Sequence, residues 1–343
     1  MKRVLIASGL VLAAAQPALA LEPEVNLSGT FGLSLSYFNS NPNTPGVVST
    51  TDVDLENNAS NFRISAAAQE GGIRAFMAYE RGASNDQLGL EDVREFFGGL
   101  SGSLGTLFYG RKSTDYKLAG VRLDPFYDTS VAGFNGGFAR EGASYGLSNL
   151  TNGFTPNTIS YRSPVAFGGL SINGAAYINE NNNVTGTGDD ADYGIGIGYS
   201  HSDWLGLDVG VQVLDLNAAS GTLVAGSPGE STAIRAHGSL GEKLWAVGAS
   251  FESVDVQLEP NPRQYAFASA TYQVSEAWRL ALAYGNTKDT PFDGNGVTAG
   301  GFHDLTKNLS TYAAVKYVAL DNVTDTKNIT AAVGVKFVFD TEL

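Results

Sequence analysis

The sequence predicts an all-β protein, a 16-stranded antiparallel barrel that crosses a membrane with its strands. Apolar and polar residues alternate along most of the chain after residue 20, which is typical of strands with one apolar face. Short connections between these segments alternate with long ones, as in a barrel whose turns gather at one end and whose loops gather at the other. Only 16% of the 343 residues are charged, whereas an average soluble protein carries roughly a quarter.

The first twenty residues are predicted to be a secretory signal peptide. Lys2 and Arg3 provide a positive start, an apolar run follows from Leu5 to Ala15, and Ala18-Leu19-Ala20 forms a cleavage site. The apolar run is too short to span a membrane as a helix. We therefore expect residues 1–20 to be removed and residues 21–343 to form the barrel.

The alternation is clearest in the first and last predicted strands. Val25 to Tyr37 places apolar residues at odd positions and small polar residues at even positions, and Ile329 to Phe339 shows the same pattern. A soluble sandwich would also alternate, but it has no reason to alternate short and long connections. Aromatic residues near strand ends, such as Tyr79 and Trp204, match the girdles of a membrane barrel at the two interfaces.

The composition excludes several other classes of protein. A chain without cysteine cannot form a disulfide or bind a metal through thiolates. Acids outnumber bases 35 to 21, giving a net charge of −14, whereas nucleic-acid binders normally carry a basic surplus. His201, His237 and His303 lie on separate segments, so we expect no enzyme and no cofactor. Acidic clusters at 86–92 and 189–192 offer oxygen ligands for Ca²⁺, but without the spacing of an EF-hand.

One predicted connection, residues 112–156, is far longer than the others. Connections of this length within a compact fold are usually functional. A barrel of sixteen strands would otherwise enclose a wide aqueous hole. We therefore expect this third long loop to fold inward and constrict the lumen.

Three blocks of sequence resemble motifs of the general bacterial porins. They are Glu95-Phe96-Phe97-Gly98-Gly99-Leu100 with Thr106-Leu107-Phe108-Tyr109-Gly110-Arg111, then Asn157-Thr158-Ile159-Ser160-Tyr161-Arg162-Ser163-Pro164, then His303-Asp304-Leu305-Thr306-Lys307 before Tyr312. Their order and separation are similar to those of the family, and the resemblance covers essentially the whole chain. The glycine-rich, lysine-poor sequence looks closer to the alphaproteobacterial members than to the enterobacterial ones.

The resemblance implies a homotrimer in the outer membrane of a Gram-negative bacterium, in contact with lipid and lipopolysaccharide. The implied function is that of a general diffusion porin, a water-filled channel for small hydrophilic solutes and ions. One alternative is a substrate-selective channel in which aromatic residues of the long connection stack on a sugar. Another is an outer-membrane enzyme or adhesin. In the substrate-selective alternative, the aromatic residues that would stack on the sugar are Tyr116, Phe126, Tyr127, Phe134 and Phe138.

The resemblance also implies rows of opposite charge that face each other across the constriction. An arginine at the lipid midplane would cost about 2–4 kcal/mol, and the alternation places Arg63 and Arg162 on the polar, lumen-facing side. Arg111 breaks the alternation, but Gly110 before it permits an inward turn. The basic candidates are Arg63, Arg74, Arg111 and Arg162, and the acidic candidates are Asp124, Asp128 and Glu141. Alternatively, the acids only pin the long connection to the wall through salt bridges.

Three smaller expectations complete the interpretation. Arg235 and His237 share the lumen-facing parity and are expected to line the pore. The acidic surplus of the long connections predicts a weak preference for cations, because charge at the mouth of a pore attracts counterions. The resembling family usually ends in phenylalanine, whereas here Phe339 is followed by Asp340-Thr341-Glu342-Leu343.

Overall fold

The computed structural model describes residues 23–43, 48–83, 90–133, 145–151, 153–166, 168–178, 192–201, 206–216, 224, 227–290, 293–321 and 325–342, with backbone alone at 90–92. The predicted signal peptide therefore lies outside the described residues. Nearly all of the regular structure is strand. The strands are β1 (Glu24–Asn41), β2 (Thr50–Asn57), β3 (Asn61–Glu70), β4 (Ile73–Ala83), β5 (Leu90–Gly102), β6 (Gly105–Lys112), β7 (Thr155–Arg162), β8 (Leu170–Tyr177), β9 (Asp192–His201), β10 (Gly206–Leu216), β11 (Ser231–Glu242), β12 (Trp245–Val256), β13 (Arg263–Gln273), β14 (Trp278–Lys288), β15 (Gly294–Thr306), β16 (Leu309–Leu320) and β17 (Lys327–Glu342).

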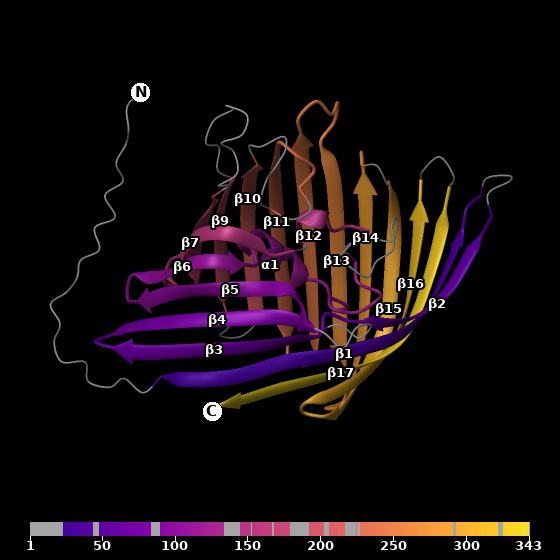
Figure 1. Cartoon of the computed structure of the whole chain (residues 1–343). Helices are drawn as coiled ribbons and strands as arrows, with labels where there is room; N and C mark the ends of the chain where they lie inside the picture. Colours follow the sequence, from indigo (N-terminus) through magenta and orange to yellow (C-terminus); the bar gives the residue numbers. More distant parts are fainter. Residues whose placement is uncertain are drawn as a thin grey trace.

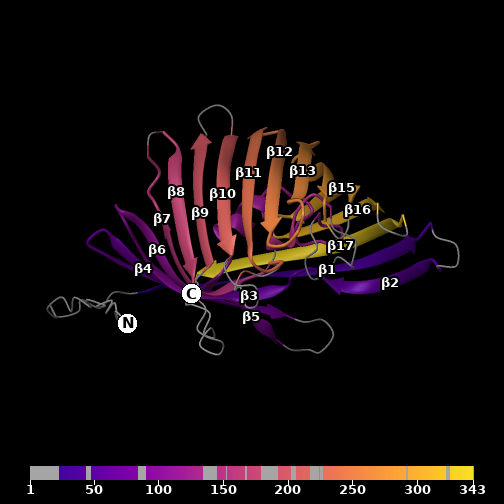
Figure 2. The ribbon, with the colours of Figure 1, turned by 90° about the horizontal axis from the view of Figure 1, so that it is seen from above.

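The strands form one closed antiparallel barrel (Figures 1 and 2). From β3 to β17 each strand pairs with the next one in sequence, and β17 pairs with β1 to close the ring. Both β2 and β3 pair with β1, one with each half, so these two of the seventeen strands occupy a single position in the wall. The wall therefore has sixteen strand positions, and the predicted 16-stranded barrel is confirmed.

The break between β2 and β3 has a local cause. Ala59 adopts a left-handed conformation with φ of 56°, which interrupts the extended backbone. The Ser60 hydroxyl accepts a hydrogen bond from the Gly32 amide (3.0 Å), and the Asn58 amide donates to the Gly32 carbonyl (2.8 Å). These bonds keep the wall joined to β1 across the break.

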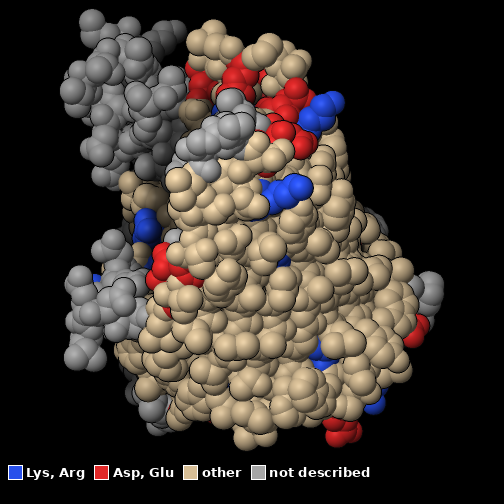
Figure 3. All heavy atoms as spheres, turned by 90° about the vertical axis from the view of Figure 1, so that its right-hand side faces the viewer, with Lys and Arg blue, Asp and Glu red and all other residues tan. Residues whose placement is uncertain are grey.

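The two faces of the wall have opposite character. On β1, the side chains of Phe31 and Leu35 are 50% and 52% exposed, while Ser34 and Ser36 between and beside them are 2% and 3% exposed. Large apolar residues therefore point outward and polar residues inward, which is the reverse of a soluble sandwich. Figure 3 shows a broad expanse of uncharged residues on the outer face, with acidic side chains gathered at its upper end.

The connections differ between the two ends of the barrel. Two-residue turns at 71–72, 103–104, 243–244 and 307–308 lie at one end, and longer connections such as 42–49 and 257–262 lie at the other. Two short helical elements, α1 (Asp115–Val121) and η1 (Asn149–Thr151), interrupt the connection between β6 and β7. Within the described ranges, no helix is both long and apolar enough to cross a membrane.

The residues after Phe339 extend the last strand. Asp340 and Thr341 continue the pairing of β17 with β1, opposite Ser28 and Leu27. The ring of Phe339 covers Gly29 so closely that a Cβ built there would lie 2.7 Å from it. The departure from a terminal phenylalanine thus adds strand residues without displacing Phe339 from the wall.

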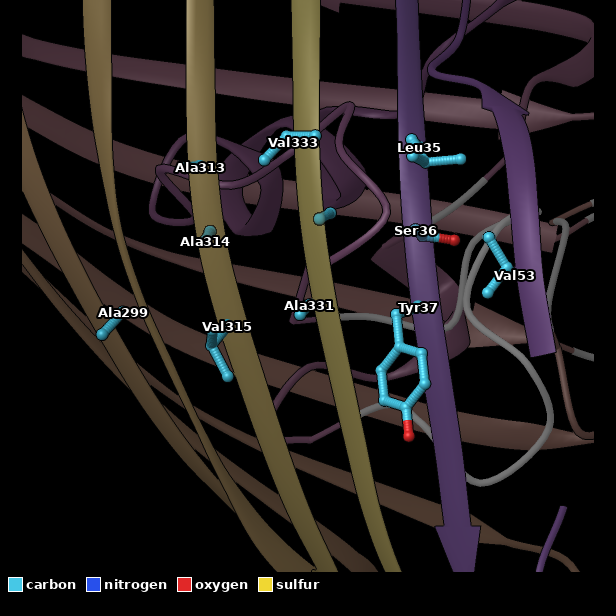
Figure 4. A pocket seen from close by; sticks show the side chains of 11 residues that line it. Leu35, Ser36, Tyr37, Val53, Ala299, Ala313, Ala314, Val315, Ala331 and Val333 are labelled. Atoms are coloured by element: carbon cyan, nitrogen blue, oxygen red, sulfur yellow. The ribbon is translucent and has the colours of Figure 1, made fainter. Parts of the chain in front are cut away.

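A shallow apolar groove of about 570 Å³ crosses the outer face over β15, β16, β17, β1 and β2 (Figure 4). Three alanines, Ala299, Ala313 and Ala331, leave the hollow because their side chains are short. Larger side chains border it, namely Leu35, Tyr37, Val53, Val315 and Val333.

Candidate channel constriction

Residues 113–154, between β6 and β7, are called the inner segment below. Its described parts are 113–133, 145–151 and 153–154, and they bond to the polar face of the wall. The Ser269 hydroxyl of β13 donates to the Leu123 carbonyl (2.5 Å), Thr298 of β15 donates to the Val131 carbonyl (3.2 Å) and Lys316 of β16 donates to the Ala132 carbonyl (3.2 Å). These parts of the segment therefore lie against the inner face of the barrel.

Helix α1 begins the inner segment. Thr114 is extended and its hydroxyl accepts a hydrogen bond from the Lys117 amide (2.9 Å), so it caps the helix, and Asp115 follows in the first turn. Both residue types are favoured at the positive end of a helix. The helix contacts β9, β10 and β11, and its Tyr116 and Lys117 side chains are buried.

A fully buried ion pair fastens α1 and η1 to the wall. Arg235 of β11 lies 2.8 Å from Glu252 of β12, and the two side chains are 0% and 1% exposed. Arg235 donates to the Tyr116 carbonyl and to the Thr151 hydroxyl, both at 2.7 Å. Glu252 accepts from the hydroxyls of Tyr116 (2.7 Å) and Ser148 (2.5 Å). Arg235 points inward as its parity predicted, but the expectation that it lines the pore is wrong, because it is fully buried in this anchor.

A second anchor lies further along the inner segment at Tyr145. Its hydroxyl pairs with that of Thr298, its ring stacks on Phe267 with centroids 6.2 Å apart, and both it and Phe267 are buried. The ring fits because the wall presents two glycines here. A Cβ at Gly296 would lie 2.6 Å from the Tyr145 ring, and a Cβ at Gly285 would lie 2.7 Å from the Gly146 Cα atom.

The structure places Asp124 inside the turn rather than at an open surface. Its carboxylate accepts hydrogen bonds from the Phe126 amide (2.9 Å) and the Gly133 amide (2.7 Å). Burial raises the pKa of Asp124 to about 6, although both hydrogen bonds and the charge of Lys316 act in the other direction. Asp124 therefore shapes the inner segment and takes up a proton on acidification from about pH 7 to 5.

Asp128 is the acid that meets basic side chains. It has a left-handed backbone with φ of 60°, and its carboxylate lies 3.9 Å from the Lys336 ammonium. Burial raises the pKa of Asp128, and the charges of Lys336, Arg94 and Lys117 oppose this rise. The third predicted acid, Glu141, lies outside the described residues.

Arg63 belongs to a network of four charged side chains on β3, β4 and β5. Its guanidinium lies 3.2 Å from Glu80 and 2.8 Å from Glu95. Glu80 also pairs with Arg94 at 2.7 Å. Arg63 keeps 31% of its side chain exposed and Arg94 keeps 22%, so both cations remain within reach of solvent.

The inner segment approaches this network through Phe154. The ring contacts two cations, with Arg94 at 4.8 Å and Lys117 at 4.0 Å from its centroid, and these distances are favourable for cation–π contact. Burial, together with the nearby charge of Arg94, lowers the pKa of Lys117 to about 8. Lys117 nevertheless remains mostly charged at pH 7.

Sequence reasoning missed Arg94 and Lys117, and the reason for Arg94 is a β-bulge. Glu80 pairs with Glu95 but Arg81 pairs with Val93, so Arg94 is an extra residue in β5. A bulge changes the side to which a residue points, and simple alternation from Phe96 assigns Arg94 to the outer face. Lys117 carried a weak signal, since it follows a Thr-Asp start of helix in the long connection.

The other predicted arginines lie apart from Arg63. Arg162 pairs with Asp115 at the start of α1. Arg111 is paired opposite Phe96, which is 55% exposed on the outer face, and its Nε donates to the Val93 carbonyl (2.9 Å), whereas Lys112 after it is buried. Arg74 is opposite Ser101 beside a short turn and lies 3.8 Å from Glu24. The structure therefore groups Arg63 with Arg94 and Lys117 rather than with Arg74.

The calcium prediction has no test in the structure. Residues 84–89 and 179–191, which contain most of the two acidic clusters, lie outside the described residues, as do the side chains at 90–92. Among the residues that are described, no three His, Asp or Glu side chains are grouped so as to hold a metal ion. Calcium binding at these clusters stays a prediction.

A closed barrel with an apolar outer face and a charged, partly filled interior defines an integral membrane channel of the outer-membrane type. Residues 7–323 match the model of the Gram-negative porin family, and the chain belongs to this family. Membership of this family, together with the barrel fold, indicates a channel protein of the outer membrane. No curated protein is significantly similar to it in sequence.

Solved structures share its fold over nearly the whole chain. The anion-selective porin from Comamonas acidovorans is 17% identical, with a TM-score of 0.73, and the match covers 93% of this chain and 100% of that one. The trimer form of OmpT, an outer membrane protein of Vibrio cholerae, is 15% identical with a TM-score of 0.62, covering 92% and 99%. Salmonella typhi OmpF, in complex with daunomycin, is 17% identical with a TM-score of 0.61, covering 92% and 97%.

Proposed function

We propose that the protein is a general diffusion porin, in which the inner segment narrows a water-filled channel for small hydrophilic solutes and ions. The observation that carries this proposal is the attachment of the inner segment to β11, β12, β13, β15 and β16. This attachment also brings Asp128 into the electrostatic surroundings of Arg94 and Lys117.

Charged side chains on the inner face of the wall and on the inner segment are proposed to act together as the selective element. Arg63, Arg94 and Arg162 supply basic groups from the wall, and Asp115 and Asp128 supply acidic groups from the inner segment. Opposed charges order water between them, so an apolar solute that displaces this water loses favourable electrostatic interactions. Small hydrated solutes keep their water and pass.

A substrate-selective channel is less well supported. The proposed sugar path needs accessible aromatic faces, but Tyr116 and Phe126 are 2% and 0% exposed. Their rings fill the space between the inner segment and the wall. Phe134 and Phe138 lie outside the described residues, and Tyr127 is partly buried against the core of the segment.

Solute flux distinguishes the two kinds of channel. We expect liposomes that contain the purified protein to swell at rates that fall steeply with solute size and rise linearly with sugar concentration. The physical reason is that a constriction without a sugar site acts as a sieve. Liposome swelling with a graded series of neutral sugars measures this, and saturation at millimolar sugar would contradict the general porin.

We further propose a weak preference for cations. The described acids near the long connections outnumber the bases there, and their potential reaches about 8 Å at physiological ionic strength. A reversal potential of cation sign in a potassium chloride gradient is expected, and it should shrink as the salt concentration rises. A clear anion preference would contradict this. The described acids near the long connections are Asp255, Glu259, Asp289, Asp293, Asp321 and Asp325.

We also propose that the protein is a homotrimer embedded in lipid and lipopolysaccharide, after removal of residues 1–20. The alanine-lined groove on the outer face (Figure 4) supports close contact between walls, because short side chains let two surfaces approach. The mass of the purified protein in detergent, by light scattering, tests the trimer. A monomer at all protein concentrations would contradict it.

A further inference from the structure

A second, smaller pocket lies on the inner side of the barrel, between the inner segment and the wall. Its volume is about 110 Å³, and it is bordered by Pro125 and residues 127–129 of the segment, by Asn58 and by residues of β1, β14, β15, β16 and β17. This volume corresponds to roughly four water molecules at about 30 Å³ each. It therefore suits a solute of a few non-hydrogen atoms.

Two cationic side chains border this pocket, Arg279 of β14 and Lys336 of β17. The Arg279 guanidinium lies 4.4 Å from the centroid of the Phe302 ring. Stacking of this kind leaves the N–H groups at the edge of the guanidinium plane available to an acceptor. Within the described part of the chain, Arg279 makes no hydrogen bond or ion pair.

Lys336 is likewise only weakly paired. Its ammonium lies 3.9 Å from Asp128, at the limit of an ion pair, and 39% of its side chain is exposed. Among the described residues that line the pocket, two are cationic and one, Asp128, is acidic, while Asp304 outside the lining also acts on the charge of Arg279. An arginine and a lysine together favour a carboxylate, which the guanidinium can bind with two parallel hydrogen bonds.

The remaining walls fit the non-charged part of such a solute. Phe302 and Tyr312 present aromatic rings, and the Asn58 side chain and the Ser310 hydroxyl add polar groups. Asn58 itself is held in place, because its amide donates to the Tyr312 hydroxyl (3.0 Å). A short hydrocarbon or hydroxylated chain can therefore pack beside the rings while its carboxylate faces the cations.

We propose that this pocket is a weak binding subsite for small monocarboxylates on their way through the channel. The inference rests on the proposed channel function, because the solute reaches the pocket through the lumen. The subsite acts only on a solute within the pocket. It is compatible with the proposed cation preference, because the surplus of acids at the long connections governs which ions enter the channel. The subsite makes the flux of carboxylates saturable, whereas neutral solutes of the same size diffuse through the channel without binding.

Single-channel recording with lactate as the probe tests the subsite. We expect lactate, added to one side, to reduce the mean open-channel current in a saturable manner, whereas glycerol leaves the current proportional to bulk conductivity. Arg279→Gln and Lys336→Gln should each weaken the apparent affinity for lactate about tenfold or more, because each removes charge-assisted hydrogen bonding worth at least about 1.4 kcal/mol.

Arg263→Gln is the matched control, because Arg263 pairs with Glu259 at a long connection (2.5 Å) and does not border the pocket. Its lactate affinity should equal that of the wild type. Unsaturable lactate currents, or equal affinity in all three variants, would overturn the subsite while leaving the channel intact. A protein that shows no open-channel current at all would instead contradict the proposed function.

Discussion

Replacement of Glu252 by alanine is expected to release the inner segment from the wall. Glu252 accepts hydrogen bonds from Tyr116, Ser148 and Arg235 in a site that is fully buried. Its removal leaves Arg235 as an uncompensated buried charge, and breaking such a pair costs about 3–5 kcal/mol. We expect rapid hydrogen exchange at α1 and a flickering single-channel current in place of a steady level.

The control is Glu259→Ala, which breaks an ion pair of the same type near the surface. Glu259 lies 2.5 Å from Arg263 at a long connection, where solvent screens the charges and such a pair contributes about 0–1 kcal/mol. Its hydrogen exchange and current should match the wild type. Glu252→Gln keeps one acceptor oxygen and should fall between the two. If Glu252→Ala behaved like Glu259→Ala, the anchoring role of this ion pair would be wrong.

Replacement of Gly285 by valine tests the second anchor by steric means, without a change in charge. A Cβ at this position would lie 2.7 Å from the Gly146 Cα atom and 2.9 Å from the Tyr145 carbonyl oxygen. Because both contacts are with backbone, the inner segment itself must move, and overpacking of this kind costs about 1–3 kcal/mol. We expect Tyr145 to leave its recess and the current to become unsteady, as in Glu252→Ala.

Gly174→Val provides the comparison for Gly285→Val. Gly174 lies in β8, and among the described residues a Cβ there would meet only the Gly194 carbonyl oxygen, at 3.9 Å. Both variants add the same side chain to a strand of the wall. Equal currents and equal tyrosine fluorescence in the two variants would show that the recess at Gly285 does not hold the segment.

The barrel was predictable because its signal is repeated along the whole chain. Alternation sets which side chains face lipid, and it holds in strands such as β1, where Phe31 and Leu35 point out and Ser34 and Ser36 point in. The break at Ala59 carried no such signal. It depends on two hydrogen bonds with Gly32 on another strand, which donates its amide to Ser60 and accepts from the Asn58 amide. The sequence pattern alone does not reveal these bonds.

The charged site was only partly predictable, since parity fixes the face of a residue but not its depth or its partners. Arg63 is on the inner face as predicted, and Arg74 on a neighbouring strand lies beside a short turn with Glu24. Arg94 was not predicted as an inner-face residue because a bulge in β5 changes the alternation. Asp124 stabilises a turn, because its carboxylate accepts hydrogen bonds from the amides of Phe126 and Gly133. These contacts arise from tertiary structure, which the sequence pattern does not show.

The central claim is that this barrel is an open, water-filled channel narrowed by the inner segment. Recording of the purified protein in planar bilayers tests it most directly. The account predicts stepwise openings, grouped in threes, with a steady current that is proportional to voltage and that loses its steadiness in Glu252→Ala. Absence of any conductance from correctly folded protein in the bilayer would contradict the account.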